Sequence, residues 1–323
     1  MAGTDLFALT TRPDPALLYR RGDPHDVRLG EVVAVDSAAY AAARAVILGC
    51  PQDEGVRRNR GRPGARRAPA EIRRCLYRMA AGPLAPLGLF DLGDIAVQGD
   101  LEAIHELQRA AVRQLVADGK RLVVLGGGND ISFPDCAGLA DVVRDVLALN
   151  LDAHFDVRVD TPRNSGTPYR QLLEEGLLAP AAFYEVGAQP LASSPAYERY
   201  LRERGATIVW ARALRAGVEP VLRAILARHA QPAVFWGLDM DVVRAADAPG
   251  VSAPNPLGIP GEELCRAAEI AGAEPRTRIL EISEVNPDYD VDQRTARLAA
   301  AAVWTFLAAL AGSAEGQTLN AER

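Results

Sequence analysis

Three side chains that can bind a metal ion stand at alternate positions in the segment 151–156. Asp152, His154 and Asp156 follow the apolar run 146–149, and a run of this length between polar residues is typical of a buried strand. The three side chains would then leave the carboxyl end of a strand, the edge of an α/β sheet where ligands bind. Two carboxylates and an imidazole suit Mn²⁺, Zn²⁺ or Fe²⁺. Taken alone, the segment is equally compatible with a polar loop that contains one incidental histidine.

Other unusual polar residues also stand directly after apolar runs. The glycines at 126–128 follow the run 122–125 and lead into Asn129, and glycine lets the backbone turn sharply and approach a ligand. A phosphate-binding loop is the competing interpretation, but no Gly-Lys-Ser/Thr follows and the G-x-G-x-x-G spacing is absent. The remaining strand-end residues are Asp239 and Asp241 after the run 233–238, and Glu284 after the run 279–282.

These carboxylates are expected to converge, because the carboxyl ends of parallel strands lie on one edge of a sheet. Carboxylates packed together repel one another unless cations neutralise them. Four aspartates with one imidazole are enough to hold two divalent ions that share bridging oxygens. The alternative for Asp239 and Asp241, taken by themselves, is turn formation or helix capping.

The rest of the chain alternates between strand-like and helical segments, which predicts a mostly parallel sheet covered on both faces. Residues 1–40 form a polar, proline-containing arm, 298–311 belong to a core-packed helix rather than a membrane span, and 312–323 are expected to be a frayed tail. We expect one domain over residues 1–323. The predicted strands are 45–49, 122–125, 146–151, 183–187, 207–210, 233–238 and 279–282, and the predicted helices are 69–79, 101–118, 218–229, 261–273 and 292–310.

Composition excludes several classes of protein. The formal net charge of −6 argues against a nucleic-acid surface. The four cysteines form no C-x-x-C pair, so zinc-ribbon and thioredoxin-like sites are excluded. Sparse cysteines and a first segment without an apolar signal region predict reduced thiols in the cytoplasm, with no membrane partner.

The strand-end residues resemble the signatures of the ureohydrolase superfamily, which includes arginase and agmatinase. The resemblance spans roughly residues 45–310. It implies a three-layer α/β/α sandwich on an eight-stranded, mostly parallel sheet, and a dinuclear Mn²⁺ centre. The matching motifs, in the order of the family, are Gly-Gly-Gly-Asn at 126–129, Asp-Ala-His-Phe-Asp at 152–156, Asp-Met-Asp at 239–241 and Glu-Val-Asn-Pro at 284–287.

Within the superfamily the chain is most similar to the formimidoylglutamases of histidine degradation. The similar segments are 53–65, 155–158, 165–171, 248–254 and 288–297. The resemblance implies hydrolysis of the C–N bond of N-formimidoyl-L-glutamate to L-glutamate and formamide by a metal-activated hydroxide. Alternatives are a sibling enzyme that releases urea from arginine, agmatine or a guanidino acid, and a homologue that binds a ligand without catalysis.

One departure from the family pattern concerns the metal ligands. The family has histidine at the position of Asn129, and an amide oxygen is a weaker ligand for Mn²⁺. We therefore expect unequal sites. The weaker set would be Asn129, Asp152, Asp156 and Asp239, and the firmer set Asp152, His154, Asp239 and Asp241.

A second departure concerns proton transfer. The loop that carries a histidine in arginase has none here, and His25, His105 and His229 are expected at the surface. The resemblance implies that Glu284 binds the amidinium nitrogens and that Asp156 handles the proton.

The amidine substrate carries two carboxylates, which arginine can bind bidentately. The expected substrate-binding residues are Arg58, Arg158, Asn164, Ser165 and Glu284. We also expect a homo-oligomer, whose size the sequence does not indicate.

Overall fold

The computed structural model describes residues 5–321, with side chains as far as residue 313. Its centre is a nine-stranded sheet in the order β1-β3-β2-β4-β9-β8-β5-β6-β7. Only β1 is antiparallel to its neighbour. The strands are β1 (Thr10–Thr11), β2 (Ala45–Gly49), β3 (Leu89–Ile95), β4 (Arg121–Leu125), β5 (Val146–Leu151), β6 (Phe183–Ala188), β7 (Thr207–Trp210), β8 (Ala233–Asp239) and β9 (Thr277–Ser283).

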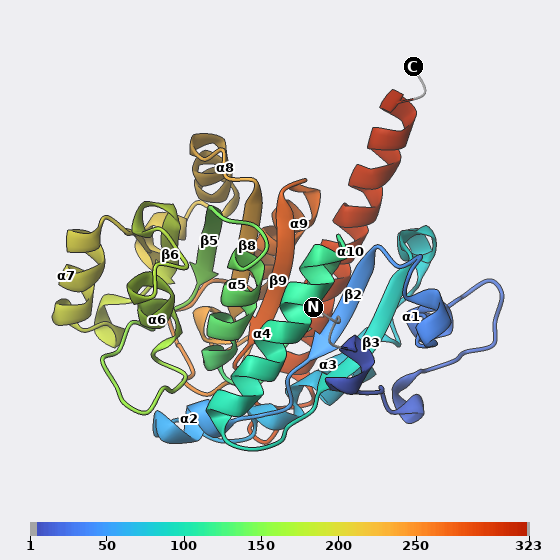
Figure 1. The fold of residues 1–323 in the computed structure, drawn as a ribbon, viewed down its shortest axis with the longest axis horizontal. Coiled ribbons are helices and arrows are strands. Elements are labelled where there is room, and N and C mark those ends of the chain that lie inside the picture. The colour runs from blue at the N-terminus through green and yellow to red at the C-terminus, as the bar shows by residue number, and fades with distance from the viewer. Residues whose placement is uncertain (1–4, 322–323) are drawn as a thin grey trace.

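Helices cover both faces of this sheet (Figure 1). Local sequence explains where α4 begins. The Asp100 carboxylate accepts a hydrogen bond from Ala103 N and so caps the N-terminus of this helix. The helices are α1 (Leu29–Val32), α2 (Glu54–Arg58), α3 (Ala68–Leu76), α4 (Leu101–Ala117), α5 (Ser132–Ala140), α6 (Pro168–Glu174), α7 (Pro195–Arg204), α8 (Glu219–Arg228), α9 (Gly261–Ala273) and α10 (Arg294–Ala321).

Alternation along the strands builds two separate cores. Val46 and Leu48 belong to the apolar cluster under α4 and α5, whereas Ile47 belongs to the cluster under α3, α9 and α10. Successive side chains of a strand point to opposite faces, so a strand buried on both faces is apolar throughout. The result is the expected three-layer α/β/α arrangement.

The expected count of eight strands is wrong by one. The extra strand is β1, through which the N-terminal arm pairs with the edge strand β3. The structure also contains β3 itself, which the sequence did not predict because its segment includes Asp91, Gly93 and Asp94. Asp91 is buried because the Arg73 guanidinium donates to both of its oxygens, at 2.8 and 2.9 Å. A buried ion pair from distant parts of the chain thus replaces the usual apolar residues.

The C-terminal helix α10 is long and apolar enough to cross a membrane by length and composition. In this structure it packs against α9 and α3, and Val303, Phe306 and Leu307 are fully buried. These contacts agree with the predicted core-packed helix. The predicted frayed tail begins at Gly312, but α10 continues as helix to Ala321, and residues 322–323 lie outside the described residues.

Candidate metal centre and substrate cavity

The strand-end residues meet where four neighbouring central strands end. The strands β4, β9, β8 and β5 are adjacent in the sheet, in this order. Asn129 opens the turn after β4, Asp152 follows β5, Asp239 ends β8 and Glu284 follows β9. The predicted convergence at one sheet edge is therefore observed.

Three of the predicted metal ligands form a compact cluster. Carboxylate oxygens of Asp152, Asp156 and Asp239 all lie within 4.8 Å of one another. His154 Nδ1 is 3.2 Å from Asp152 Oδ1 and 3.9 Å from Asp241 Oδ2, so the imidazole and the fourth aspartate lie beside the cluster. Carboxylates and one imidazole in this arrangement suit a hard or borderline divalent cation such as Mn²⁺.

Backbone hydrogen bonds orient these aspartates. His154 N donates to Asp152 Oδ1 at 2.8 Å, Asp241 N donates to Asp239 Oδ1 at 2.7 Å, and Ala253 N donates to Asp241 Oδ1 at 3.1 Å. Each of the three carboxylates therefore has one oxygen held by the backbone, and the second oxygen of Asp152 has only two long contacts of 3.4 Å, to Asn129 Nδ2 and Asn150 Nδ2. Such supporting hydrogen bonds orient metal ligands before the ion binds.

Two site residues have unusual backbone conformations. Asp156 has φ 44° and Glu284 has φ 63°, a left-handed region that non-glycine residues adopt at a cost. Glu284 is held there by a hydrogen bond from its backbone N to Gly127 O at 2.9 Å. Strain of this kind clusters at functional sites, and here it directs two carboxylates into the same space.

The electrostatics of the cluster call for a cation. Burial and the neighbouring Asp152 raise the pKa of Asp156 to about 8, and burial raises the pKa of Glu284 to about 7. Burial and Asp152 likewise hold the pKa of Asp239 well above its usual range. Burial disfavours the charged imidazole, but the hydrogen bond and charge of Asp152 outweigh it and raise the pKa of His154 to about 10. The residues present thus fit a bound divalent cation, which would keep these carboxylates ionised.

Asn129 faces the cluster with its amide nitrogen. Nδ2 donates to Asp156 Oδ2 at 2.6 Å, while Oδ1 accepts from the hydroxyls of Ser132 and Ser283 at 2.9 and 3.1 Å. In this orientation the side chain offers no ligand atom to a cation. A half-turn of the amide would exchange its oxygen and nitrogen and place the oxygen on the metal side.

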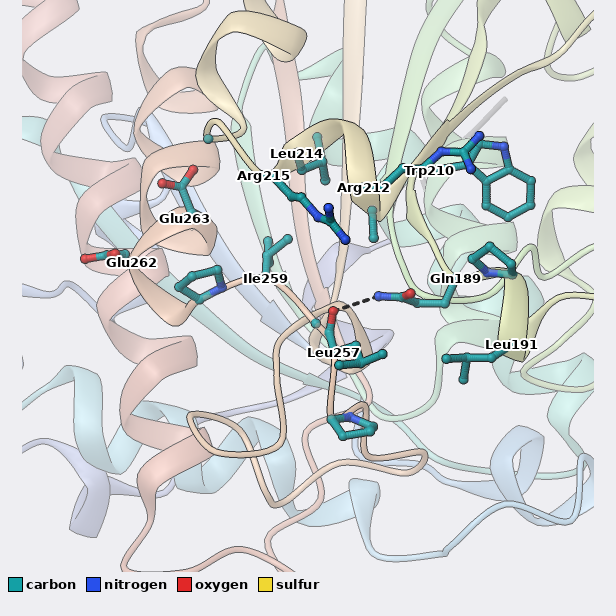
Figure 2. A pocket seen from close by; sticks show the side chains of 16 residues that line it. Gln189, Leu191, Trp210, Arg212, Leu214, Arg215, Leu257, Ile259, Glu262 and Glu263 are labelled. Carbon is teal, nitrogen blue, oxygen red and sulfur yellow. Dashed lines mark hydrogen bonds between the residues drawn. The ribbon is translucent and has the colours of Figure 1, made fainter.

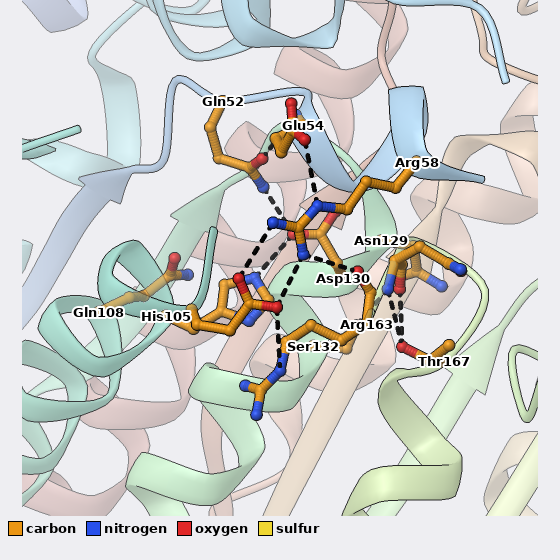
Figure 3. Close-up of polar contacts among 12 residues, drawn as sticks. Gln52, Glu54, Arg58, His105, Gln108, Asn129, Asp130, Ser132, Arg163 and Thr167 are labelled. Carbon is orange, nitrogen blue, oxygen red and sulfur yellow. Dashed lines mark hydrogen bonds and ion pairs between the residues drawn. The ribbon is translucent and has the colours of Figure 1, made fainter. Parts of the chain in front are cut away.

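The two predicted arginines differ in their environments. Arg58 is already neutralised: its guanidinium donates to both oxygens of Glu102, at 2.7 and 3.0 Å, and to Glu54 at 3.1 Å (Figure 3). Arg158 is exposed, and in the described part of the chain it has no acidic partner within 4.0 Å. Its side chain lies directly over Gly166, where a Cβ atom would come within 2.5 Å of Arg158 Cδ.

The other two predicted substrate residues have structural contacts. Asn164 Oδ1 accepts from Gly166 N at 2.9 Å, so Asn164 stabilises the turn beneath Arg158. Ser165 Oγ accepts from Asn59 Nδ2 at 3.0 Å and joins this turn to the segment after α2. A cavity of about 520 Å³ lies here, lined by Arg58, Asn59, Arg60, Arg158, Val159, Asp160, Thr161, Pro162 and Asn164.

A buried polar group lies next to Asn129, at Asp130, and was not predicted from the sequence. His105 was expected at the surface, but it is buried and its Nε2 is 2.8 Å from Asp130 Oδ2 (Figure 3). Gln52 Nε2 donates to the same oxygen at 2.7 Å. The group links α4 to the segments after β2 and β4. Only the position of Asp130, next to Asn129, gave a signal for it in the sequence.

A larger cavity of about 760 Å³ lies beyond the carboxyl ends of β6 and β7 (Figure 2). It contains none of the predicted site residues. Its wall includes Gln189, whose Nε2 donates to Leu257 O at 2.8 Å and whose backbone N donates to Ala153 O at 2.9 Å. The wall of this cavity is therefore joined through Gln189 to the loop that carries Asp152 and His154.

Comparison with known proteins places the chain among metal-dependent hydrolases. The arginase family model matches residues 43–309. A formimidoylglutamase from Rhodococcus opacus is 34% identical over 292 residues, which cover 85% of this chain and 89% of that protein.

Solved structures with the same fold point in the same direction. The formiminoglutamase from Trypanosoma cruzi with Mn²⁺ superposes with a TM-score of 0.84 at 31% identity, covering 88% of this chain and 99% of that one. Proclavaminate amidino hydrolase from Streptomyces clavuligerus superposes with a TM-score of 0.77 at 25% identity, covering 84% and 93%. Since the family model matches most of the chain and a relative is 34% identical over 85% of it, the chain belongs to the arginase family.

Proposed function

We propose that this protein hydrolyses the C–N bond of N-formimidoyl-L-glutamate and releases L-glutamate and formamide. The observation that carries the proposal is the cluster of Asp152, Asp156 and Asp239, followed two residues after Asp156 by Arg158, which lines a cavity and has no acidic partner among the described residues. The formimidoylglutamases to which the chain is similar support the choice of substrate. A dicarboxylate amidine fits this arrangement, because one of its carboxylates can pair with Arg158 while its amidinium group can pair with Glu284.

The proposed cofactor is a pair of Mn²⁺ ions. Asp152 and Asp239 would serve both ions, His154 and Asp241 the firmer site, and Asp156 and Asn129 the weaker one. When bound, two such cations lower the pKa of a water molecule to near neutrality and so supply a hydroxide nucleophile. The carboxylate oxygens left free by the backbone hydrogen bonds support this assignment.

Glu284 is proposed to orient the amidine. Its Oε1 accepts a hydrogen bond from Asn129 N at 2.7 Å, so the carboxylate cannot rotate freely. Its Oε2 is buried and has no partner among the described residues. An ionised Oε2 would accept hydrogen bonds from the amidinium nitrogens and hold the formimidoyl carbon in place. A charge-assisted hydrogen bond of this kind also stabilises the positive charge of the substrate.

Asp156 is proposed to move the proton. The leaving group is the amine of glutamate, which must gain a proton as the C–N bond breaks. Without metal, burial and Asp152 raise the pKa of Asp156 to about 8; a bound cation would lower it, so the ionised carboxylate would accept a proton and return it to the leaving amine. No histidine of the described chain stands in the loop 157–167, so no imidazole competes for this role.

Arg158 is proposed to bind a substrate carboxylate, with Asn164 and Ser165 shaping the turn beneath it. Arg58 then acts differently from our sequence-based expectation: because Glu102 and Glu54 already neutralise it, it would hold α2 against α4 rather than bind an anion. Arg60 lines the same cavity and has no acidic partner in the described residues, so it is the better second arginine.

The direct test is turnover by the Mn²⁺-loaded protein with formimidoylglutamate, arginine and agmatine in parallel. We expect formamide and glutamate from the first and little urea from the other two. Urea release from arginine or agmatine would assign the chain to a different ureohydrolase, and failure with every substrate would indicate a binding homologue. Arg158→Ala should raise KM for formimidoylglutamate by about 10-fold or more, since hydrogen bonds to charged groups contribute about 1.5–3 kcal/mol. Arg57→Ala, an exposed arginine outside this cavity, is the matched control.

We place the enzyme in the cytoplasm, as a homo-oligomer acting on a small molecule. The location is supported by Cys50, Cys75, Cys136 and Cys265, all of which are free thiols in the structure. The number of subunits is open to measurement by light scattering.

A further inference from the structure

The amide of Asn129 lies in a small buried pocket of hydroxyl groups. Ser132 Oγ and Ser283 Oγ lie 2.9 and 3.1 Å from Asn129 Oδ1, and all three residues are buried. Ser132 begins α5, and Ser283 ends β9. The hydroxyls therefore come from two elements that are far from each other in sequence and that meet behind the carboxylate cluster.

The direction of the Ser132 hydroxyl is set by a second contact. Ser132 Oγ also lies 2.5 Å from Glu281 Oε1. Glu281 and Ser283 are two residues apart on β9, so their side chains leave the same face of the sheet: Glu281 reaches α5, and Ser283 reaches the turn just before it. A hydroxyl has one hydrogen, so Ser132 cannot donate to Glu281 and to Asn129 at the same time. The short contact favours donation to Glu281.

Glu281 is in turn held by a neighbouring acid. Asp135, one turn along α5 from Ser132, accepts from Gln108 Nε2 at 2.8 Å through Oδ1. Its Oδ2 and Glu281 Oε2 are both buried and have no donor among the described residues. Burial raises the pKa of Asp135 to about 7 and that of Glu281 well above its usual range, and a proton shared between Asp135 Oδ2 and Glu281 Oε2 would satisfy both of these buried oxygens. Glu281 Oε1 is then left as the acceptor for Ser132.

These contacts match an amide whose nitrogen, not its oxygen, faces the serines. An NH₂ group has two hydrogens, and the pocket offers two hydroxyl oxygens, one of which has already given its hydrogen to Glu281. The amide oxygen would then occupy the place from which Nδ2 now reaches Asp156 at 2.6 Å and Asp152 at 3.4 Å. That is the metal side of the residue.

We propose that Ser132 and Ser283 are positioning residues that turn the Asn129 amide oxygen toward the metal site, with Glu281 and Asp135 fixing Ser132. An amide, unlike an imidazole, has one end that repels a cation. By holding that end away from the metal, the two serines allow asparagine to act as a ligand where the family pattern has histidine. The proposal rests on the two-ion centre of the proposed function.

The test is calorimetric titration of the metal-free, full-length protein with MnCl₂. Ser132→Ala should weaken binding of the second, weaker Mn²⁺ by about 10- to 100-fold, the usual effect of losing an outer hydrogen-bond partner of a metal ligand. The firmer site should keep its affinity. Thr277→Val is the matched control: it removes a buried hydroxyl, which accepts from Trp236 Nε1, at the opposite end of β9. Both affinities should survive it.

A double variant separates positioning from general destabilisation. A histidine at position 129 has no amide oxygen and nitrogen that could exchange places, so it does not need the two hydroxyls to orient it. The loss caused by Ser132→Ala should therefore largely disappear in an Asn129→His background. An equal loss in both backgrounds, or no loss in the wild-type background, overturns the proposal.

Failure of this positioning proposal and failure of the proposed function give different results. Wild-type protein that binds one Mn²⁺ and still releases formamide overturns the positioning proposal and leaves the proposed activity intact. Protein that binds two ions and shows the Ser132 effect, yet releases no formamide, overturns the proposed activity and leaves the positioning role supported.

Discussion

The two sides of the carboxylate cluster are built differently. On the side of β5 and β8, the carboxylates of Asp152, Asp239 and Asp241 each accept from a backbone N–H, and two of these donors lie two residues away. On the side of β4 and β9, Asn129 is held by Ser132 and by Ser283, which lies 154 residues further along the chain. The proposed ligands of the first side are charged and are held mostly by nearby backbone groups, so we call it the charged side. The proposed ligand of the second side, Asn129, is uncharged and is held partly by a distant residue, so we call it the neutral side after this ligand.

The two sides should differ in their affinity for metal. The charged side repels itself without a cation, so its gain on binding Mn²⁺ is large. The neutral side contributes one dipole, whose value depends on which end of the amide faces the ion. We therefore expect ions to bind the β5–β8 side first and more tightly.

The largest effect should follow from Asp239→Asn, which removes a carboxylate shared by both proposed ion sites. Mn²⁺ affinity should fall by more than the ~10- to 100-fold typical of outer partners, and turnover should fall with it. Metal analysis after dialysis measures the loss. Asp141→Asn, which alters a surface carboxylate paired with Arg109, is the control and should behave as wild type. Two tightly bound ions in Asp239→Asn would remove this residue from the centre.

Glu284→Gln should reduce kcat by about 10²- to 10³-fold, the usual effect of losing one electrostatic contact to the reacting group. Glutamine keeps an oxygen for the Asn129 N–H, so the backbone on the β4–β9 side should be undisturbed. Steady-state kinetics and Mn²⁺ titration of the same sample separate the two effects. A variant that turns over normally, or one that loses its metal, would contradict the assignment of Glu284 to the substrate.

The carboxylates of the charged side should also make the stabilisation of the fold by Mn²⁺ depend on pH. Burial and Asp152 raise the pKa of Asp156 from 3.8 to about 8 in the folded protein without metal. The resulting contribution to stability is complete below about pH 4 and is lost as pH rises through 8, because the unfolded chain ionises first. Mn²⁺ favours the ionised form.

The rise in melting temperature caused by Mn²⁺ should therefore be larger at pH 8 than at pH 6, and Asp156→Asn should reduce the difference. Thermal unfolding at matched Mn²⁺ concentrations measures it. An equal or larger rise at pH 6 would show that protons do not compete with the ion on this side.

The smallest effect should come from Asn129→His on the neutral side. An imidazole binds Mn²⁺ without a choice of ends, so the weaker affinity should rise, by less than about 10-fold because one ligand of several changes. In calorimetry the two binding steps should move closer together. If the weaker step does not change, Asn129 does not belong to that site.

Sequence patterns located the strands that carry the carboxylate cluster well. Every strand that carries a predicted ligand was located to within two residues, since apolar runs between polar turns are strong local signals. The convergence of Asp152, Asp156 and Asp239 followed from parallel strands alone. β3 was missed because its aspartates are unfavourable in strands and only the partner Arg73 explains them.

The roles of the arginines and histidines were predicted less well. Arg58 and Arg158 have the same side chain and similar loop settings in the sequence, yet one is neutralised by Glu102 from α4 and the other is unpaired. His105 was expected at the surface because it lies on a helix, but it is buried with its Nε2 against Asp130. Such pairings join segments that no local pattern relates.

The sequence by itself determined the order of the strands' polar ends, the family and the set of residues that can bind metal. These depend on residue type and short-range spacing. Only the tertiary structure decided which charges are already neutralised and how Asn129 is held. A hydrogen bond depends on the distance and direction between two groups, and here those groups come from α5, β9 and the turn after β4, which only the folded chain brings together.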